Sequence, residues 1–218
     1  MGSLASFVLE FASGALAPAR CSACDARVKI LAAFCPSCAS TIEPAPAGSP
    51  AALLYAGAAS QAIVAMKYGS RPDLARPLGD LLWRSLEPRA ASWRGAVVVP
   101  VPLHPTRLAD RGFNQSALLA ARVVGRLDGQ FEPRGLVRTR ETPQQTSLDR
   151  HARAANVAGA FRVRDAAVVR GRAVLLVDDV ATTGATLDAC TAALIEGGAA
   201  SVLRAVVAVA AHRVVTAS

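Results

Sequence analysis

Residues 174–186 read Val-Leu-Leu-Val-Asp-Asp-Val-Ala-Thr-Thr-Gly-Ala-Thr. The branched apolar residues that open this segment predict a buried strand of a parallel sheet, which we expect to stop at Asp178 and Asp179. A turn of small and hydroxyl-bearing residues follows, and residues 187–196 have the composition of a helix that ends at Gly197-Gly198. The segment therefore predicts a strand, a turn and a helix of an α/β core.

The turn between this strand and this helix has the properties of a phosphate site. Backbone N–H groups converge at a helix N-terminus, where the helix dipole is positive, and threonine hydroxyls add donors. Ionised Asp178 and Asp179 can accept hydrogen bonds from two neighbouring sugar hydroxyls. The segment could thus hold a ribose together with its 5′-phosphate. A simpler alternative is that Asp179 or Thr182 only caps the helix, which needs no ligand.

Composition restricts the class of protein further. With 218 residues, of which 52% are hydrophobic, the chain can bury an α/β core and add a small module. The formal charge of +8 favours a polyanionic partner, either a sugar polyphosphate or nucleic acid. Aromatic residues make up only 5%, so platforms for stacking bases are scarce. No apolar stretch is long enough for a membrane span, and Leu4–Ala19 lacks the basic flank of a signal peptide, so we expect a cytoplasmic protein.

Two cysteine pairs near the N-terminus have the spacing of a metal site. Cys21-x-x-Cys24 and Cys35-x-x-Cys38 are separated by ten residues. Each pair places two thiolates on one turn, and two such turns complete a tetrahedral site for structural Zn²⁺. The alternatives are disulfides, which the cytoplasm disfavours, and four free thiols.

The residue that follows each cysteine pair bears on the shape of its turn. Asp25 tolerates the left-handed backbone that is common after such a pair, whereas Ala39 does so poorly. We therefore expect a distorted second turn.

The middle of the chain shows alternating regular structure. We expect a proline-rich linker at 43–50, a strand at 51–57, helices at 60–68 and 74–86, and a buried parallel strand at 97–101. Lys67 is one of two lysines among 24 basic residues, a weak indication that a compact ammonium is needed there. A solvated lysine at a helix end is the alternative.

The segment after the strand at 97–101 is a second candidate for ligand binding. In an open parallel sheet, ligands collect beyond the C-terminal ends of the strands, so this segment and the 178–186 turn can face one crevice. Arg107 and Arg111 are four residues apart and could contact a pyrophosphate together, or could be solvated surface arginines. His104 lies between prolines, and we expect it to be a loop hydrogen-bonding residue. A helix should follow through 120–121.

From 136 to 161 the chain becomes polar and basic. Such a segment has too little apolar surface to pack firmly, which favours a mobile lid over a plain solvated connection. Phe161-Arg162-Val163 then resumes the alternation of a strand.

The order of these motifs resembles that of the ComF family, whose members are similar to type I phosphoribosyltransferases and carry an N-terminal zinc-binding module. The motifs are the cysteine pairs, Lys-Tyr, Pro-Val-Pro-Leu-His-Pro with Arg-Gly-Phe-Asn-Gln, Arg-x-Arg-x-Thr-x-x-Gln, and the Asp-Asp turn. The resemblance covers nearly the whole chain. It implies a phosphoribosyltransferase-like domain at 46–218, with a parallel sheet of about five strands flanked by helices. Residues 1–45 would form an N-terminal helix and the four-cysteine zinc module.

The resemblance also implies a function and the residues that perform it. Ribose 5-phosphate would pass from 5-phosphoribosyl 1-pyrophosphate (PRPP), bound with Mg²⁺, to an unidentified base or amine. A non-catalytic module for PRPP or nucleotide sensing, or for binding nucleic acid in DNA uptake, is the alternative, and a homo-oligomer is compatible with both. Asp178 and Asp179 would be catalytic. The 5′-phosphate site would comprise Ala181, Thr182, Thr183, Gly184, Ala185 and Thr186; the pyrophosphate site Leu103, His104, Arg107 and Arg111; and the flexible loop Arg138, Arg140, Thr142 and Gln144.

Overall fold

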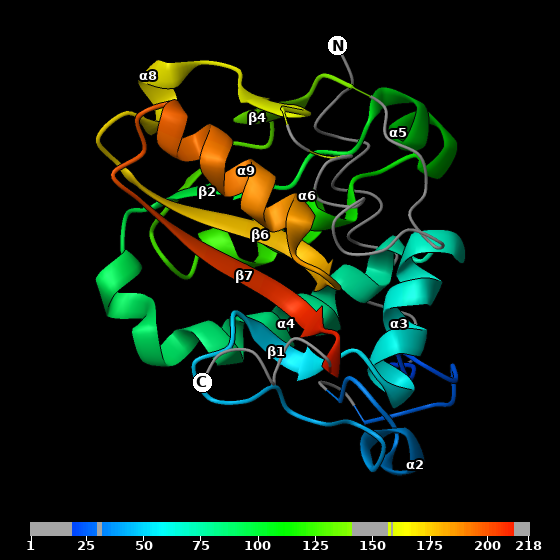
Figure 1. The fold of residues 1–218 in the computed structure, drawn as a ribbon. Helices are drawn as coiled ribbons and strands as arrows, with labels where there is room; N and C mark the ends of the chain where they lie inside the picture. Colours follow the sequence, from blue (N-terminus) through cyan, green and yellow to red (C-terminus); the bar gives the residue numbers. More distant parts are fainter. Residues whose placement is uncertain (1–18, 30–31, 141–156, 158, 212–218) are drawn as a thin grey trace, which may run out of the picture.

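A five-stranded parallel sheet lies at the centre of the computed structural model, which describes residues 19–29, 32–140, 157 and 159–211 (Figure 1). Its strand order is β1-β7-β6-β2-β3, and every neighbouring pair is parallel. The predicted α/β class and the number of strands are confirmed. The strands are β1 (Ala51–Leu54), β2 (Val97–Pro100), β3 (Gln130–Phe131), β6 (Ala173–Ala181) and β7 (Ser201–Val209).

Helices cover both faces of the sheet. Along β6, Leu175 and Val177 point into one core and Val174 and Leu176 into the other, because side chains alternate along a strand. The first core is closed by α3 (Gly57–Tyr68), α4 (Ala75–Leu86) and α6 (Gln115–Val124). The second is closed by α9 (Ala185–Glu196) and by the antiparallel hairpin of β4 (Leu136–Arg138) and β5 (Phe161–Val163).

The remaining elements are short. They are α2 (Pro36–Ala39), α5 (Pro105–Arg111), α8 (Ala166–Val169) and the 3-10 turns η1 (Pro72–Leu74) and η2 (Glu87–Trp93). Among the described helices, none is long and apolar enough to cross a bilayer.

Several expected boundaries were wrong, and the strand expected at 51–57 already ends at Leu54. β6 does not stop before the two acids but continues through Ala181, because β7 extends beside it and pairs Asp178 with Val206 and Ala181 with Val209. The segment around Arg107 is a helix, α5, with a proline at its first position and a left-handed glycine, Gly112, after its end.

Another correction concerns α3 and the segment before it. α3 begins at Gly57, three residues earlier than the sequence pattern indicates. The proline-rich segment, expected to be a linker of limited flexibility, pairs in part with β1: Ala45 N–H donates to Ala52 O at 3.1 Å and Leu54 N–H donates to Glu43 O at 2.8 Å. This pairing covers the outer edge of β1, which would otherwise present unpaired backbone groups.

Candidate functional site

Two buried carboxylates lie near the C-terminal end of β6. Asp178 is 7% exposed and Asp179 is 2% exposed. Asp178 Oδ1 accepts the Ser116 hydroxyl at 2.7 Å and the Asp179 backbone N–H at 2.9 Å. Asp179 Oδ1 accepts the Val180 N–H at 2.9 Å, and its Oδ2 lies 2.7 Å from Lys67 Nζ. Asp178 therefore contacts α6, and Asp179 contacts α3.

Burial gives the two acids different electrostatic characters. Burial raises the pKa of Asp178 and the adjacent Asp179 raises it further, to about 7, although Lys67 and the hydrogen bonds act in the opposite direction. Burial acts to lower the pKa of Lys67, but the Asp179 carboxylate outweighs it, so this pKa is raised. Lys67 and Asp179 therefore form a charged pair, while Asp178 changes protonation near neutral pH.

The turn after β6 leads directly into an uncapped helix. The N-cap of α9 is Gly184, at φ 79°, and no side chain caps the helix. Asp179 turns toward Lys67 instead, so the alternative in which Asp179 or Thr182 caps α9 is wrong. The nearest side-chain contact is long, from the Ala185 N–H to Thr183 Oγ1 at 3.4 Å. The first amides of α9 have no acceptor within the helix, and this end carries positive dipole charge, so the turn suits an anion.

The predicted pyrophosphate segment begins where β2 ends. Leu103 and His104 lie in the connection to α5, and His104 Nδ1 is 2.9 Å from Thr106 Oγ1, which is the loop hydrogen bond expected for this histidine. Arg107 and Arg111 lie one turn apart on α5 and are both half-buried. The Arg111 guanidinium lies over the Tyr68 ring, 5.4 Å from its centroid.

The end of α3 connects the acids to α5. Lys67 pairs with Asp179, and its neighbour Tyr68 stacks with Arg111. The structure thus brings the two predicted sites together through two residues of a third segment. In the sequence, only the scarcity of lysine indicated a role for Lys67. Nothing outside the family motif indicated a role for Tyr68.

Two further residues were missed by sequence reasoning. Asn114 donates from its side-chain amide to Val101 O at 3.1 Å, which holds the start of the pyrophosphate segment. Its Oδ1 accepts the Ser116 N–H at 3.0 Å and so caps α6. An Asn before an apolar helical pattern could have indicated the cap. The contact of Ser116 with Asp178 had no local signal.

The predicted lid begins at the β4–β5 hairpin. The Arg138 guanidinium lies 5.5 Å from the centroid of Phe161, and the Thr139 N–H donates to Ala160 O at 2.9 Å. A groove of about 390 Å³ runs between this hairpin and α9, and it is lined by Phe161 and by Thr183 of the turn after β6. Arg140 is described and exposed, whereas Thr142, Gln144 and most of the predicted lid lie outside the described residues.

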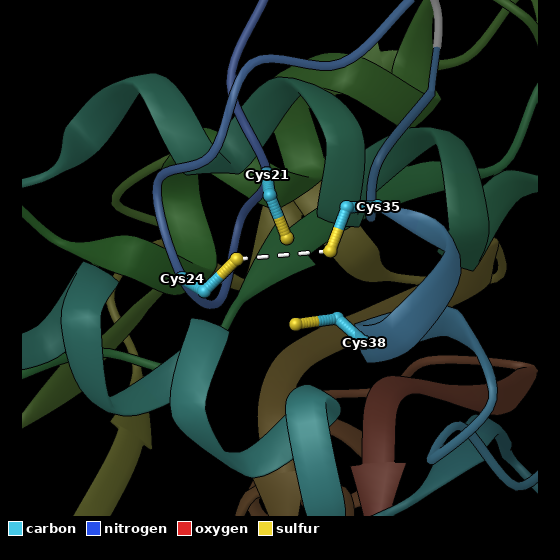
Figure 2. A group of neighbouring side chains, drawn as sticks. All are labelled: Cys21, Cys24, Cys35 and Cys38. Carbon is cyan, nitrogen blue, oxygen red and sulfur yellow. Dashed lines mark hydrogen bonds between the residues drawn. The ribbon is translucent and has the colours of Figure 1, made fainter.

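The four N-terminal cysteines converge on one centre, as Figure 2 shows. The sulfur atoms of Cys21, Cys24, Cys35 and Cys38 all lie within 4.8 Å of one another, and those of Cys24 and Cys35 are 3.7 Å apart. Tetrahedral zinc with Zn–S bonds of about 2.3 Å requires sulfurs about 3.8 Å apart. A disulfide requires about 2.05 Å. The cluster therefore fits a four-thiolate zinc site.

The surroundings shift the pKa values of two of these thiols in opposite directions. The Ser37 hydroxyl and the Cys38 backbone N–H lower the pKa of Cys35 to about 6. Burial, and then the three neighbouring cysteines, raise the pKa of Cys38 to about 12. Four thiolates this close repel one another, and a divalent cation at their centre removes that repulsion.

The two cysteine turns differ in shape, as their sequences indicate. Asp25 takes the left-handed conformation, at φ 61°. Ala39 does not, and instead ends the short helix α2 that carries Cys38. The second cysteine turn therefore lacks the left-handed residue of the first, yet its two sulfurs still lie within the cluster.

Comparison with known proteins identifies relatives of this chain. Residues 114–215 match the family described as "Phosphoribosyl transferase domain". "DNA utilization protein YhgH" of Escherichia coli K12 is 36% identical over 153 residues, which cover 68% of this chain and 66% of that protein, slightly under two thirds. Its counterpart from Salmonella typhi is 29% identical over 203 residues, covering 84% of this chain and 86% of that protein.

A solved structure is also similar. It is the glutamine phosphoribosylpyrophosphate amidotransferase from B. subtilis complexed with ADP and GMP, with 22% identity and a TM-score of 0.44. The match covers 66% of this chain and 30% of that one.

Proposed function

Because this chain belongs to the ComF family and contains a phosphoribosyl transferase domain, we propose that it binds PRPP and transfers the ribose 5-phosphate to a base or amine. In this reaction, a bond forms between the acceptor nitrogen and the ribose C1 while the bond from C1 to the pyrophosphate oxygen breaks. Pyrophosphate leaves with the electron pair, and the acceptor nitrogen loses a proton to solvent.

The observation that carries the proposal is the buried pair of Asp179 and Lys67 beside the uncapped start of α9. Among the described residues, Asp179 Oδ2 has the Lys67 ammonium as its partner and no regular hydrogen bond. Oδ2 is buried, so a ribose hydroxyl can donate to it once the site opens, and the neighbouring Asp178 can bind the adjacent hydroxyl. Both acids then lie close to the C1 that becomes positive as pyrophosphate leaves, and they stabilise that charge electrostatically.

The turn at 181–186 anchors the other end of the sugar. Its threonine hydroxyls and the first amides of α9 bind the 5′-phosphate, and this remote contact orients the reacting carbon. Arg107 and Arg111, with the backbone at Leu103 and His104 and the arginines of the predicted lid, neutralise the pyrophosphate. Mg²⁺ arrives with PRPP, since this ion retains water and phosphate oxygens as its main ligands.

Calorimetric titration of the full chain with PRPP and Mg²⁺ tests the proposal. Saturable binding that weakens at least tenfold in Asp179→Asn supports it. Asp128→Asn is a matched control, because Asp128 is an exposed acid whose ion pair is with Arg94 at the surface. Absence of binding at millimolar PRPP, or equal affinity in both variants, contradicts the proposal. Pyrophosphate release in the presence of candidate bases and amines then tests catalysis.

A second candidate is a module that binds a nucleotide or nucleic acid without catalysis. It is favoured by the relatives named DNA utilization proteins and by the net charge of +8. Binding to DNA through phosphate contacts predicts an affinity that falls steeply and linearly in a log–log plot against salt. Such a slope, together with no affinity for PRPP, favours this candidate over the transferase.

A further inference from the structure

The helix that carries Lys67 is held at its start by the second cysteine turn. Thr41, three residues after Cys38, accepts the Ala58 N–H of α3 on its hydroxyl at 3.0 Å. The same hydroxyl donates to Cys38 O at 2.8 Å. No residue next to α3 in the sequence supplies a side-chain cap, so Thr41 provides it from a distant segment. The second cysteine turn and the first turn of α3 thus share one hydroxyl.

Backbone packing makes this junction tight. Gly57, the first residue of α3, has φ 47°, and a Cβ there would lie 2.5 Å from Thr41 O. Only glycine permits this approach. A shift of the second cysteine turn is therefore transmitted to the start of α3.

The other end of the helix is held by the first cysteine turn. Arg71, three residues after the last residue of α3, donates to Asp25 Oδ1 at 3.1 Å, and Asp25 directly follows Cys24. Arg71 is oriented for this contact because it also grips Asp73 with two hydrogen bonds, at 2.8 and 2.7 Å. Arg20 holds the other oxygen of Asp25 at 2.9 Å.

The two anchors enclose the residue on which the candidate site depends. Lys67 lies in the last turn of α3, between Thr41 at one end and Asp25 at the other, and its ammonium lies 2.7 Å from Asp179. A shift of α3 would lengthen this contact and weaken the compensation of the buried Asp179 charge. The position of α3 therefore controls the electrostatics of the acid that we assign to the ribose.

We propose that the four-cysteine module positions the PRPP site. Metal bound by the cysteines fixes both cysteine turns, and these turns hold the two ends of α3 through Thr41 and Asp25. The helix in turn holds Lys67 against Asp179. Zinc loading then sets the affinity for PRPP. The inference rests on the proposed function for its ligand, but the coupling from the cysteines to α3 can be measured without any ligand. Thr41 and Asp25 are positioning residues, since neither contacts the acids.

The experiment compares the full chain with and without zinc. Hydrogen exchange is followed separately for the amides of α3 and of β6, and PRPP with Mg²⁺ is titrated into both forms. We expect zinc removal to speed exchange in α3 at least tenfold, to leave β6 unchanged and to raise the PRPP Kd about tenfold. Because coupling between binding equilibria is reciprocal, PRPP must raise the zinc affinity, measured by equilibrium competition with a chelator, by the same factor.

Variants that retain all four cysteines separate coupling from metal binding. Thr41→Val keeps the side-chain shape without the hydroxyl, and Asp25→Gly keeps the left-handed backbone without the carboxylate. Ser40→Ala is the matched control for the first, because the Ser40 hydroxyl donates to Ser37 O at 2.8 Å within the same turn. Asp128→Gly is the control for the second, because Asp128 is also left-handed, at φ 47°, and exposed.

With one zinc per chain confirmed by elemental analysis, the Thr41→Val/Asp25→Gly double variant should already exchange rapidly in α3, and its PRPP affinity should depend little on zinc. The control variants should behave as the parent. Unchanged exchange in α3 after zinc removal, or in the zinc-loaded double variant, overturns the coupling. If zinc-loaded parent protein binds no PRPP, the proposed function fails, while the exchange data still decide whether the module positions α3.

Discussion

Lys67 Nζ lies 2.7 Å from Asp179 Oδ2, and the two side chains are 21% and 3% exposed. This contact joins the last turn of α3 to the strand that carries both candidate acids. It gives the site a fixed positive charge that the sequence motif at 174–186 does not contain.

Removing the ammonium should destabilise the protein strongly. Lys67→Met leaves Asp179 buried and unpaired, and breaking a buried pair in this way costs about 3 kcal/mol. Urea denaturation measures the change in the free energy of unfolding. The double variant Lys67→Met/Asp179→Asn should recover most of that loss, because no uncompensated charge remains, yet it should not recover PRPP binding. Equal stability of the single and double variants would contradict the pairing.

The pH dependence of stability should reveal Asp178. Its pKa is raised to about 7 in the folded protein, against about 4 in the unfolded chain. Between these values the unfolded chain has lost the proton and the folded protein retains it, so the contribution of Asp178 to the free energy of unfolding falls as pH rises and levels off above 7.

Asp178→Asn removes this contribution and keeps an oxygen that can accept the two hydrogen bonds on Oδ1. The variant should therefore gain melting temperature relative to the parent as pH is raised from 5 to 8, by several degrees. Melting curves at both values check the difference, with Asp128→Asn as the control for an exposed acid. A difference that does not change with pH would show that Asp178 titrates normally.

Loss of the Ser116 hydroxyl should act mainly on the ionised form of Asp178. The hydroxyl donates to Asp178 Oδ1 at 2.7 Å, and a hydrogen bond to a charged group contributes about 1.5–3 kcal/mol. Ser116→Ala should therefore cost more stability at pH 8 than at pH 5, as measured by urea midpoints at both values. Ser85→Ala, which loses a hydroxyl bond to the neutral Leu82 O, should show no such dependence.

The turn proposed to bind the 5′-phosphate contains a left-handed residue directly before α9. Gly184 has φ 79°, and a residue with a Cβ is strained there by about 1–2 kcal/mol. Gly184→Ala should weaken PRPP binding about tenfold by displacing the first amides of α9. Gly184→Asn should be milder, because Asn visits this conformation more readily. Calorimetry measures the PRPP affinity of both variants, and affinities equal to that of the parent would contradict a phosphate site in this turn.

Much of the core could be predicted from local pattern. The continuous apolar run of residues 174–177 predicted a buried strand, and the spacing of the leucines in 74–86 predicted the amphipathic helix α4. The two cysteine pairs predicted their cluster for a similar reason, since each pair lies on one turn. Such interactions span only a few residues.

Other features depend on distant partners. β6 extends past the acids because β7 pairs with it, and α3 starts early because Thr41 caps it. The Arg111 side chain on α5 is placed by Tyr68 of α3, over whose ring its guanidinium lies. Most of these contacts join residues that are far apart in the sequence. No local periodicity or capping residue therefore predicts them.

The amino-acid sequence alone thus determined the strand, turn and helix of residues 173–196 and the paired cysteines, because backbone propensity and turn chemistry act between near neighbours. The tertiary structure alone decided that Lys67 faces Asp179 and that the pKa of Asp178 is raised toward neutrality. Burial and Coulomb interaction set these properties, and both depend on which distant segments the fold places around a charge.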